Sequence, residues 1–309
     1  MRILCLGAGA VGGYFCARLI EAGADVTFLV REPRRKLLTE NGLRLESVYG
    51  NFASPVKAIV KSEVSAPFDV ILLTCKAYDL AEAIKAIAPA VGRGSAILPL
   101  LNGVAHIDLL NSTYGRDFVL GGTAKIAATL LLDGTVKHLN DWNFITFGEQ
   151  DGTMSDRVRS LKAAFDKTPV VAAAVPDIMQ MMWEKLVHLA TLAGMTAAMR
   201  ANVGEILRTQ EGGGLMAAFL ARNAEIAHRE GFPPSAGWMA ECQKLISDVN
   251  SPHTTSMARD IENKGPIEAD HIIGHMLRRA VAHKIDPTLH RMVFAHLQSY
   301  EQRRAANRL

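Results

Sequence analysis

A glycine-rich run near the start of the chain has the spacing of a phosphate-binding turn. Its residues are Gly7, Ala8, Gly9, Ala10, Val11 and Gly12, the pattern G-x-G-x-x-G. The apolar run Ile3–Leu6 before it predicts a strand, and the amphipathic segment Val11–Ala22 after it predicts a helix. In this context Gly7 permits the tight turn, Gly9 lets the backbone approach a pyrophosphate, and Gly12 lets the helix pack close to the strand. The N–H groups at the helix start would bind the phosphates, so we predict a dinucleotide site rather than a plain glycine-rich turn.

A basic cluster follows the second predicted strand, Asp25–Val30. Arg31 ends this strand, and the next basic residues are Arg34, Arg35 and Lys36. In NAD-binding folds an acidic residue at this strand end binds the ribose hydroxyls, whereas a guanidinium suits the additional 2′-phosphate of NADP. Arg31 therefore favours NADP(H). The adjacent Glu32 argues weakly for NAD, and a solvated helix start would also explain the basic residues.

Two further predicted strands are followed by polar side chains. Lys76 comes after the apolar strand Asp69–Thr74, and Asn102 comes after the strand Ser95–Leu101. Residues just past the carboxyl ends of parallel strands face the ligand crevice, so both side chains are predicted to meet cofactor or substrate. An amide can bond a cofactor hydroxyl and a substrate oxygen at once. The alternatives are a solvated loop lysine and a simple Asn102-Gly103 turn.

The elements that must position these residues divide the chain into two parts. Strand and helix patterns alternate up to Pro176, with a hairpin around Tyr49-Gly50-Asn51. The alternating segment Phe118–Phe147, turning at Asp133-Gly134, predicts an antiparallel extension of the parallel sheet. Beyond Pro176, helices are predicted at about 177–200, 212–230, 235–249, 269–284 and 288–306. We therefore predict an α/β chain: a Rossmann-type NADP-binding domain with a mostly parallel sheet (1–176), then an all-α domain (177–309) for substrate and dimerisation.

Composition excludes several classes of protein. The chain has 309 residues, 49% of them apolar, which is enough for two domains and excludes wholesale disorder. A net charge of +3 is too small to indicate nucleic-acid binding. The 4 cysteines form no C-x-x-C pair and are expected to be free thiols in a reducing compartment, and no metal site is predicted. The chain enters a core strand at once and has no apolar run of about 18 residues, so we expect neither a signal peptide nor a membrane span.

Several residue clusters, in order along the chain, resemble the ketopantoate reductase family. They are the glycine run with Arg31, Cys75-Lys76-Ala77-Tyr78, Leu101-Asn102-Gly103, Trp183-Glu184-Lys185-Leu186, Thr255-Ser256-Met257 and Ile267-Glu268-Ala269-Asp270. The resemblance covers almost the whole chain. That family has a Rossmann domain followed by a helical domain, and it reduces 2-dehydropantoate to pantoate with NADPH, a step towards pantothenate and coenzyme A. The resemblance therefore implies a cytoplasmic NADP(H)-dependent 2-oxo acid reductase, with a homodimer through the helical domain as a further prediction.

The resemblance also implies roles for single residues. Lys185 would be the general acid, because a nearby ammonium stabilises and then protonates the alkoxide formed as hydride arrives. Ser256 would hold the substrate carboxylate, and Lys185 and Asn102 would also contact the substrate. The nicotinamide half of the cofactor would be lined by Lys76, Asn102, Glu268 and the backbone near Ala127. A helical lysine alone is usually solvated, but Lys185 follows the apolar residues Met181, Met182 and Trp183.

One departure from the family pattern concerns the substrate. The family has asparagines four and eight residues after the catalytic lysine, where this chain has Leu189 and Ala193. A further family asparagine falls at or beside Val203. Polar neighbours that would compensate are His188, Thr191, Thr196 and Asn202. Reductase chemistry survives this change, whereas the identity of the substrate is left open.

Three functions therefore stand as alternatives. The first is NADPH-dependent reduction of 2-dehydropantoate, and the second is the same chemistry on a more apolar 2-oxo acid. The third is a non-catalytic NADP-binding sensor. Lys185, Asn102 and Glu268 argue against the sensor, because a sensor needs only the cofactor half of the site.

Overall fold

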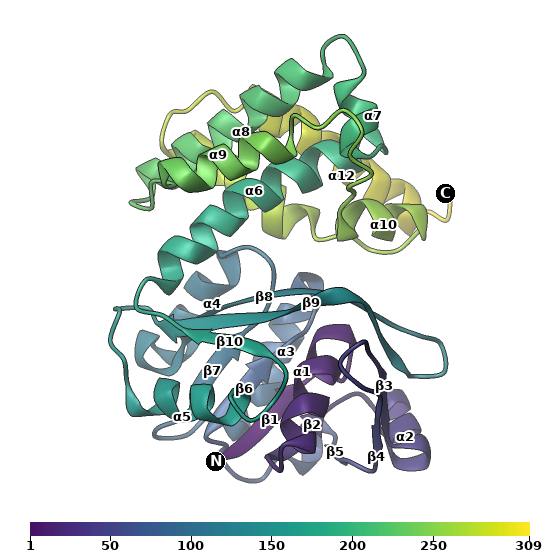
Figure 1. Cartoon of the computed structure of the whole chain (residues 1–309), viewed down its shortest axis with the longest axis vertical. Coiled ribbons are helices and arrows are strands. Elements are labelled where there is room, and N and C mark those ends of the chain that lie inside the picture. Colours follow the sequence, from purple (N-terminus) through teal and green to yellow (C-terminus); the bar gives the residue numbers. More distant parts are fainter. The chain divides into compact units, whose positions relative to one another are not determined.

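The computed structural model describes residues 1–309 and contains two compact units (Figure 1). The first, the α/β unit, comprises Met1–Leu101 and His106–Ile178. The second, the helical unit, comprises Asn102–Ala105 and Met179–Leu309. The short segment Asn102–Ala105 thus belongs with the helical unit although the chain on both sides of it belongs to the α/β unit.

A fully parallel sheet forms the base of the α/β unit. Its strand order is β5-β2-β1-β6-β7. The strands are β1 (Arg2–Leu6), β2 (Asp25–Leu29), β5 (Lys57–Ile59), β6 (Val70–Leu73) and β7 (Ala96–Pro99). Every residue of β6 and β7 is buried, which explains their continuous apolar sequence. The predicted Rossmann-type parallel sheet is confirmed.

A second sheet corrects one prediction from the sequence. It has the order β10-β9-β3-β4, with β8 paired antiparallel along almost the whole length of β9, and is not an extension of the parallel sheet. Its strands are β3 (Leu43–Glu46), β4 (Phe52–Ser54), β8 (Leu120–Leu130), β9 (Val136–Glu149) and β10 (Val171–Ala174). A single bridge, Ile97 to Val119, joins it to β7. The N–H groups of Ala96 and Leu100 point towards β6. Backbone groups alternate along a strand, so the next N–H that could pair on the β8 side is that of residue 99. Residue 99 is a proline without an N–H, so the pairing with β7 stops there. The predicted hairpin between β3 and β4 is confirmed.

Helix α1 (Ala10–Glu21) packs against strands of both sheets and fixes their spacing. Its Gly13 lies so close to β9 that an added Cβ would come within 2.6 Å of Val136 Cγ2. Phe15 from the same helix meets Phe165 edge-on, with ring centroids 6.2 Å apart. The remaining helices of the unit are α2 (Glu32–Asn41), α3 (Leu80–Ile87), α4 (Ala105–Tyr114) and α5 (Asp156–Phe165).

The helical unit is built around the long helix α6 (Ile178–Met199). The others are α7 (Val203–Leu207), α8 (Gly212–Arg229), α9 (Ala236–Leu245), α10 (Ser256–Glu262), α11 (His275–Ala282) and α12 (Thr288–Ala305). A π-helical segment, η5 (Asp270–Gly274), leads into α11, where the sequence predicted one continuous helix. Helices α7 and α10 were not predicted from the sequence. The side chains of Asn202 and Thr255 cap them, and the spacing from Asn202 to Glu205 is a capping box that could have revealed α7.

The structure also bears on membrane, metal and thiol chemistry. None of its helices is both long and apolar enough to cross a membrane. No cluster of three or more histidine, cysteine or acidic side chains is arranged to hold a metal ion. All four cysteines are free thiols, and Cys5, Cys16 and Cys242 are buried.

Candidate cofactor and substrate site

The glycine turn between β1 and α1 requires glycine at two of its positions. Gly7 has φ +102°, a conformation that other residues rarely adopt. A Cβ at Gly12 would collide with the Gly7 carbonyl oxygen and Thr74 Oγ1 and would lie 2.9 Å from Cys5 Sγ. Thr74 holds the turn by donating its hydroxyl to the Leu6 carbonyl at 2.9 Å. The turn is thus closed on the side that faces the sheet.

The same turn is open at Gly9. An added Cβ there would meet no atom within 4 Å. Gly9 is the N-cap of α1, and neither a capping side chain nor an acidic residue in the first turn occupies the helix start. The N–H groups of that turn are therefore available to an anion. This open backbone beside a positive helix end fits the pyrophosphate of a dinucleotide.

The basic cluster after β2 divides into residues with different tasks. Arg31 is the N-cap of α2, its side chain is 76% exposed, and it forms an ion pair with Asp79 at 2.6 Å. The Asp79 carboxylate raises the pKa of Arg31. Arg34 instead donates from Nε and Nη2 to the Ala8 carbonyl, at 3.0 and 2.8 Å, and from Nη1 to the Gly134 carbonyl. Arg34 therefore supports the backbone of the glycine turn, a task that the sequence analysis did not foresee.

The strand-end residues of the α/β unit lie along one edge of the parallel sheet. The glycine turn, Arg31 and Lys76 follow β1, β2 and β6, which are neighbours and parallel, so their carboxyl ends coincide. Lys76 is half-buried at the start of the 3₁₀ turn η2 (Ala77–Asp79). Ala127 lies where the pairing of β8 with β9 shifts register, a bulge of the kind often found beside active sites.

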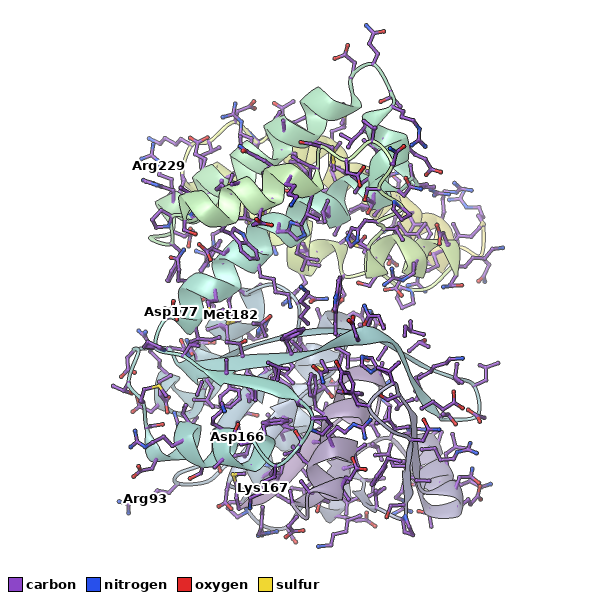
Figure 2. All side chains as sticks on the ribbon, in the orientation of Figure 1. Arg93, Asp166, Lys167, Asp177, Met182 and Arg229 are labelled. Atoms are coloured by element: carbon purple, nitrogen blue, oxygen red, sulfur yellow. The ribbon has the colours of Figure 1, made fainter.

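Lys185 lies on α6, which α9 and the segment before α9 hold in place. Trp238 Nε1 donates to the Glu184 carbonyl at 2.8 Å, and the backbone N–H of Ser235 donates to Glu184 Oε1 at 2.9 Å. Trp183 is buried and stacks on Phe232, with ring centroids 5.8 Å apart. Figure 2 labels Met182, one turn before Lys185 on this helix. Trp183 and Glu184, directly before Lys185, are thus fixed by packing and hydrogen bonds, which positions the helix backbone at the lysine.

Asn102 and Glu268 are brought together in the helical unit by His271, a residue that the sequence analysis missed. The His271 ring packs on Gly103, where an added Cβ would lie 3.4 Å from ring Cδ2. Burial lowers the pKa of His271, while the charge of Glu268 and a hydrogen bond with the Asn102 backbone oppose that effect. The side chain of Glu268 is itself buried. The position of His271, three residues after Glu268, was the available signal.

Ser256 is the first residue of α10, directly after the cap residue Thr255. Thr255 Oγ1 lies 2.9 Å from Thr196 Oγ1 on α6. Thr196 follows Lys185 by eleven residues, or about three helical turns, so it lies on the same face of α6. Ser256 is therefore tied to the helix face that carries the lysine.

Comparisons with known proteins identify the family of the chain. Models described as "Ketopantoate reductase PanE/ApbA" and its "C terminal" match residues 3–152 and 177–301. A Bacillus subtilis protein named "Uncharacterized oxidoreductase YkpB" is 32% identical over 97% of this chain and 99% of its own length. The crystal structure of 2-dehydropantoate 2-reductase from Geobacter metallireducens is 27% identical, with TM-score 0.87 over 97% of this chain and 99% of that one. A D-mandelate dehydrogenase, solved with NADH and anilino(oxo)acetate, shares the fold at 20% identity, with TM-score 0.87 and 99% coverage of both chains.

The two family models together span both units, and the relatives cover nearly the full length of the chain. The family match thus extends beyond the glycine turn, which is shared by many nucleotide-binding proteins, to helix α6 with Lys185 and to the segment before η5 with Glu268. The chain therefore belongs to the ketopantoate reductase family and is an oxidoreductase.

Proposed function

We propose that this protein reduces a 2-oxo acid to the 2-hydroxy acid with NADPH, and that 2-dehydropantoate, giving pantoate for the pantothenate and coenzyme A route, is the first substrate to test. The observation that carries the proposal is the open backbone at Gly9 with the uncapped start of α1. It supports a bound dinucleotide, and membership of the family supports the reaction class.

The residues predicted from the sequence would hold the cofactor. The turn Gly7–Gly12 would bind the pyrophosphate through the N–H groups at the start of α1, and Arg31 would bind the 2′-phosphate of NADP. Lys76, Asn102, Glu268 and the backbone at Ala127 would line the nicotinamide half. The pairing of Arg31 with Asp79 leaves its exposed guanidinium with further donors for a phosphate.

NADPH supplies the hydride, and the side chains of the protein position the substrate and move the proton. The Ser256 hydroxyl would donate a hydrogen bond to the substrate carboxylate, and the Asn102 amide would contact the acid and orient it. The ammonium of Lys185 would stabilise the negative charge that develops on the keto oxygen and then donate its proton to it. A placed general acid contributes about 10²–10⁴-fold to the rate.

We also propose the division of labour and the assembly. Residues 1–176 would bind NADP(H), residues 177–309 would bind the substrate, and the helical part would join two copies into a homodimer in the cytoplasm. Analytical ultracentrifugation of the full chain tests the dimer, and a monomer at all working concentrations would contradict it.

The experiment that tests the reaction is the oxidation of NADPH, followed by its absorbance, against a panel of 2-oxo acids with 2-dehydropantoate included. Turnover of at least one acid by the wild type, lost in Lys185→Ala with NADPH binding kept, supports the enzyme. Binding of NADPH without turnover of any acid would instead support the non-catalytic sensor.

A further inference from the structure

We propose that the substrate carries an apolar group beyond its 2-oxo acid head, and that Leu189 is the residue that selects it. The inference rests on the proposed 2-oxo acid reduction by the same site. Leu189 follows Lys185 by four residues, about 40° around α6, and its side chain is half-buried. Ala193 follows at about 80° and is buried. The helix surface next to the proton donor is therefore hydrocarbon.

The nearest hydroxyl on the same face is already committed. Thr196 is fully buried, and its hydroxyl donates to the Leu192 carbonyl at 2.8 Å. Its single proton is then used, so the contact with Thr255 must run from Thr255 to Thr196. Both hydroxyls thus serve the junction between α6 and α10 rather than a ligand.

The second hydroxyl, that of Thr191, lies on the far face of α6 and is also committed. It donates to the Val187 carbonyl at 2.8 Å and accepts from Asn223 Nδ2 at 3.0 Å. Asn223 in turn accepts a hydrogen bond from His290 Nε2 at 2.9 Å. Because the Val187 carbonyl can only accept, the direction of every hydrogen bond in this series is determined. None of its donors points to the Lys185 face.

The side-chain oxygen of Asn202, the remaining amide close to α6, is committed to helix capping. Its Oδ1 accepts from the Glu205 backbone N–H at 2.9 Å, and Glu205 accepts from the Asn202 N–H at 2.8 Å. His188 lies about 60° from Lys185 around α6, and its ring meets Trp238 edge-on at 6.3 Å. It is the polar side chain nearest to Lys185 among the four that could compensate, so it is the alternative against which Leu189 must be tested.

This arrangement weakens the binding of a substrate that carries a hydroxyl at this position. A hydroxyl brought against Leu189 loses its hydrogen bond to water and gains none, which costs about tenfold to a hundredfold in binding. A methyl group at the same place is favoured.

A matched pair of substrates tests the inference on the wild-type protein. 2-Dehydropantoate and 3,3-dimethyl-2-oxobutanoate differ only by the terminal hydroxyl. We expect kcat/KM with NADPH to be about tenfold or more higher for the second acid. In Leu189→Asn the ratio should move at least tenfold towards 2-dehydropantoate, whereas in Leu189→Met, the matched apolar control, it should stay within about threefold of the wild type.

The outcomes separate this inference from the proposed function. A wild-type preference for 2-dehydropantoate of a hundredfold or more would leave the reductase intact and overturn the inference. If that preference disappears in His188→Leu, the histidine is the polar contact for the hydroxyl. If neither acid nor any other 2-oxo acid is reduced while NADPH binds, the proposed function fails and this inference fails with it.

Discussion

Acid should destabilise the helical unit through His290, and the structure sets the size of the effect. His290 is fully buried, its Nε2 donates to Asn223, and its Nδ1 has no hydrogen-bond partner. Protonation would place a charge and an unsatisfied N–H at Nδ1 in a dry site. Burial, with a smaller contribution from Arg222 and against the opposing charge of Asp286, lowers the pKa of His290 to about 4.

The sign of the pH dependence follows from proton linkage. In the unfolded chain the pKa of His290 returns to its ordinary value of 6.5. Below that pH the unfolded state binds a proton that the folded state does not, so stability falls as the pH drops from about 6.5 to about 4. A difference of about 2.5 units at 1.36 kcal/mol each gives a loss of about 3 kcal/mol. His275, whose pKa burial also lowers to about 4, should contribute a similar loss.

Urea unfolding at a series of pH values measures this loss. Of the 3 tryptophans, Trp183 and Trp238 lie in the helical unit, so fluorescence in a Trp142→Phe background reports that unit alone. We expect the unfolding free energy to fall by several kcal/mol between about pH 7 and pH 4. The variant His290→Gln keeps a donor for Asn223 but cannot be protonated, so its curve should be flatter by about 3 kcal/mol. If the unfolding free energy falls with pH equally in this variant and in the protein that keeps His290, the loss does not come from His290.

Four further substitutions probe the cofactor and the chemistry. Arg31→Ala should weaken NADPH, but not NADH, by about tenfold, because a charge-assisted contact with the 2′-phosphate is lost; Arg35→Ala is the control, and equal use of both cofactors by the wild type would sink the idea. Lys185→Ala should lower kcat by about 10²–10⁴-fold with NADPH binding nearly unchanged in a fluorescence titration, and near-native turnover would assign the proton to another group. Gly12→Ala should lower the Tm or prevent folding, since its Cβ has no room. Gly9→Ala should fold normally and lose NADPH affinity, and a Gly9→Ala protein with native affinity would contradict the predicted pyrophosphate position.

The parts of the fold that local sequence patterns determine were predictable. The turn between β1 and α1 requires glycine for steric reasons, and the buried strands β6 and β7 have no polar interruption. The second sheet was not predictable, because the pairing of β3 with β9 joins residues far apart in the chain. Its separation from β7 depends on whether Pro99, which has no N–H, faces β6 or β8, and this is determined by the strand register.

The same distinction applies to the candidate site. Arg31 and Lys76 could be placed at the sheet edge because each directly follows a parallel strand. Arg34 could not be assigned, because its guanidinium reaches a carbonyl one hundred residues further along the chain. For His271 the sequence offers only its position three residues after Glu268, because its partner segment at Asn102 becomes its neighbour only in the folded helical unit.

The distribution of polar groups around α6 links stability with specificity. On the far face the Val187 carbonyl, Thr191, Asn223 and His290 form one series of hydrogen bonds that attaches the helix to α8 and α12. The series ends at His290, whose Nδ1 has no partner. Buried hydrogen bonds of this kind hold a helix in one position. Because the hydroxyls of α6 are used to hold the helix in place, the face with Lys185 has Leu189 and no hydroxyl of its own to offer a substrate. The same arrangement makes the helix sensitive to acid, since a proton on His290 places a charge in the network that attaches α6 to α8 and α12.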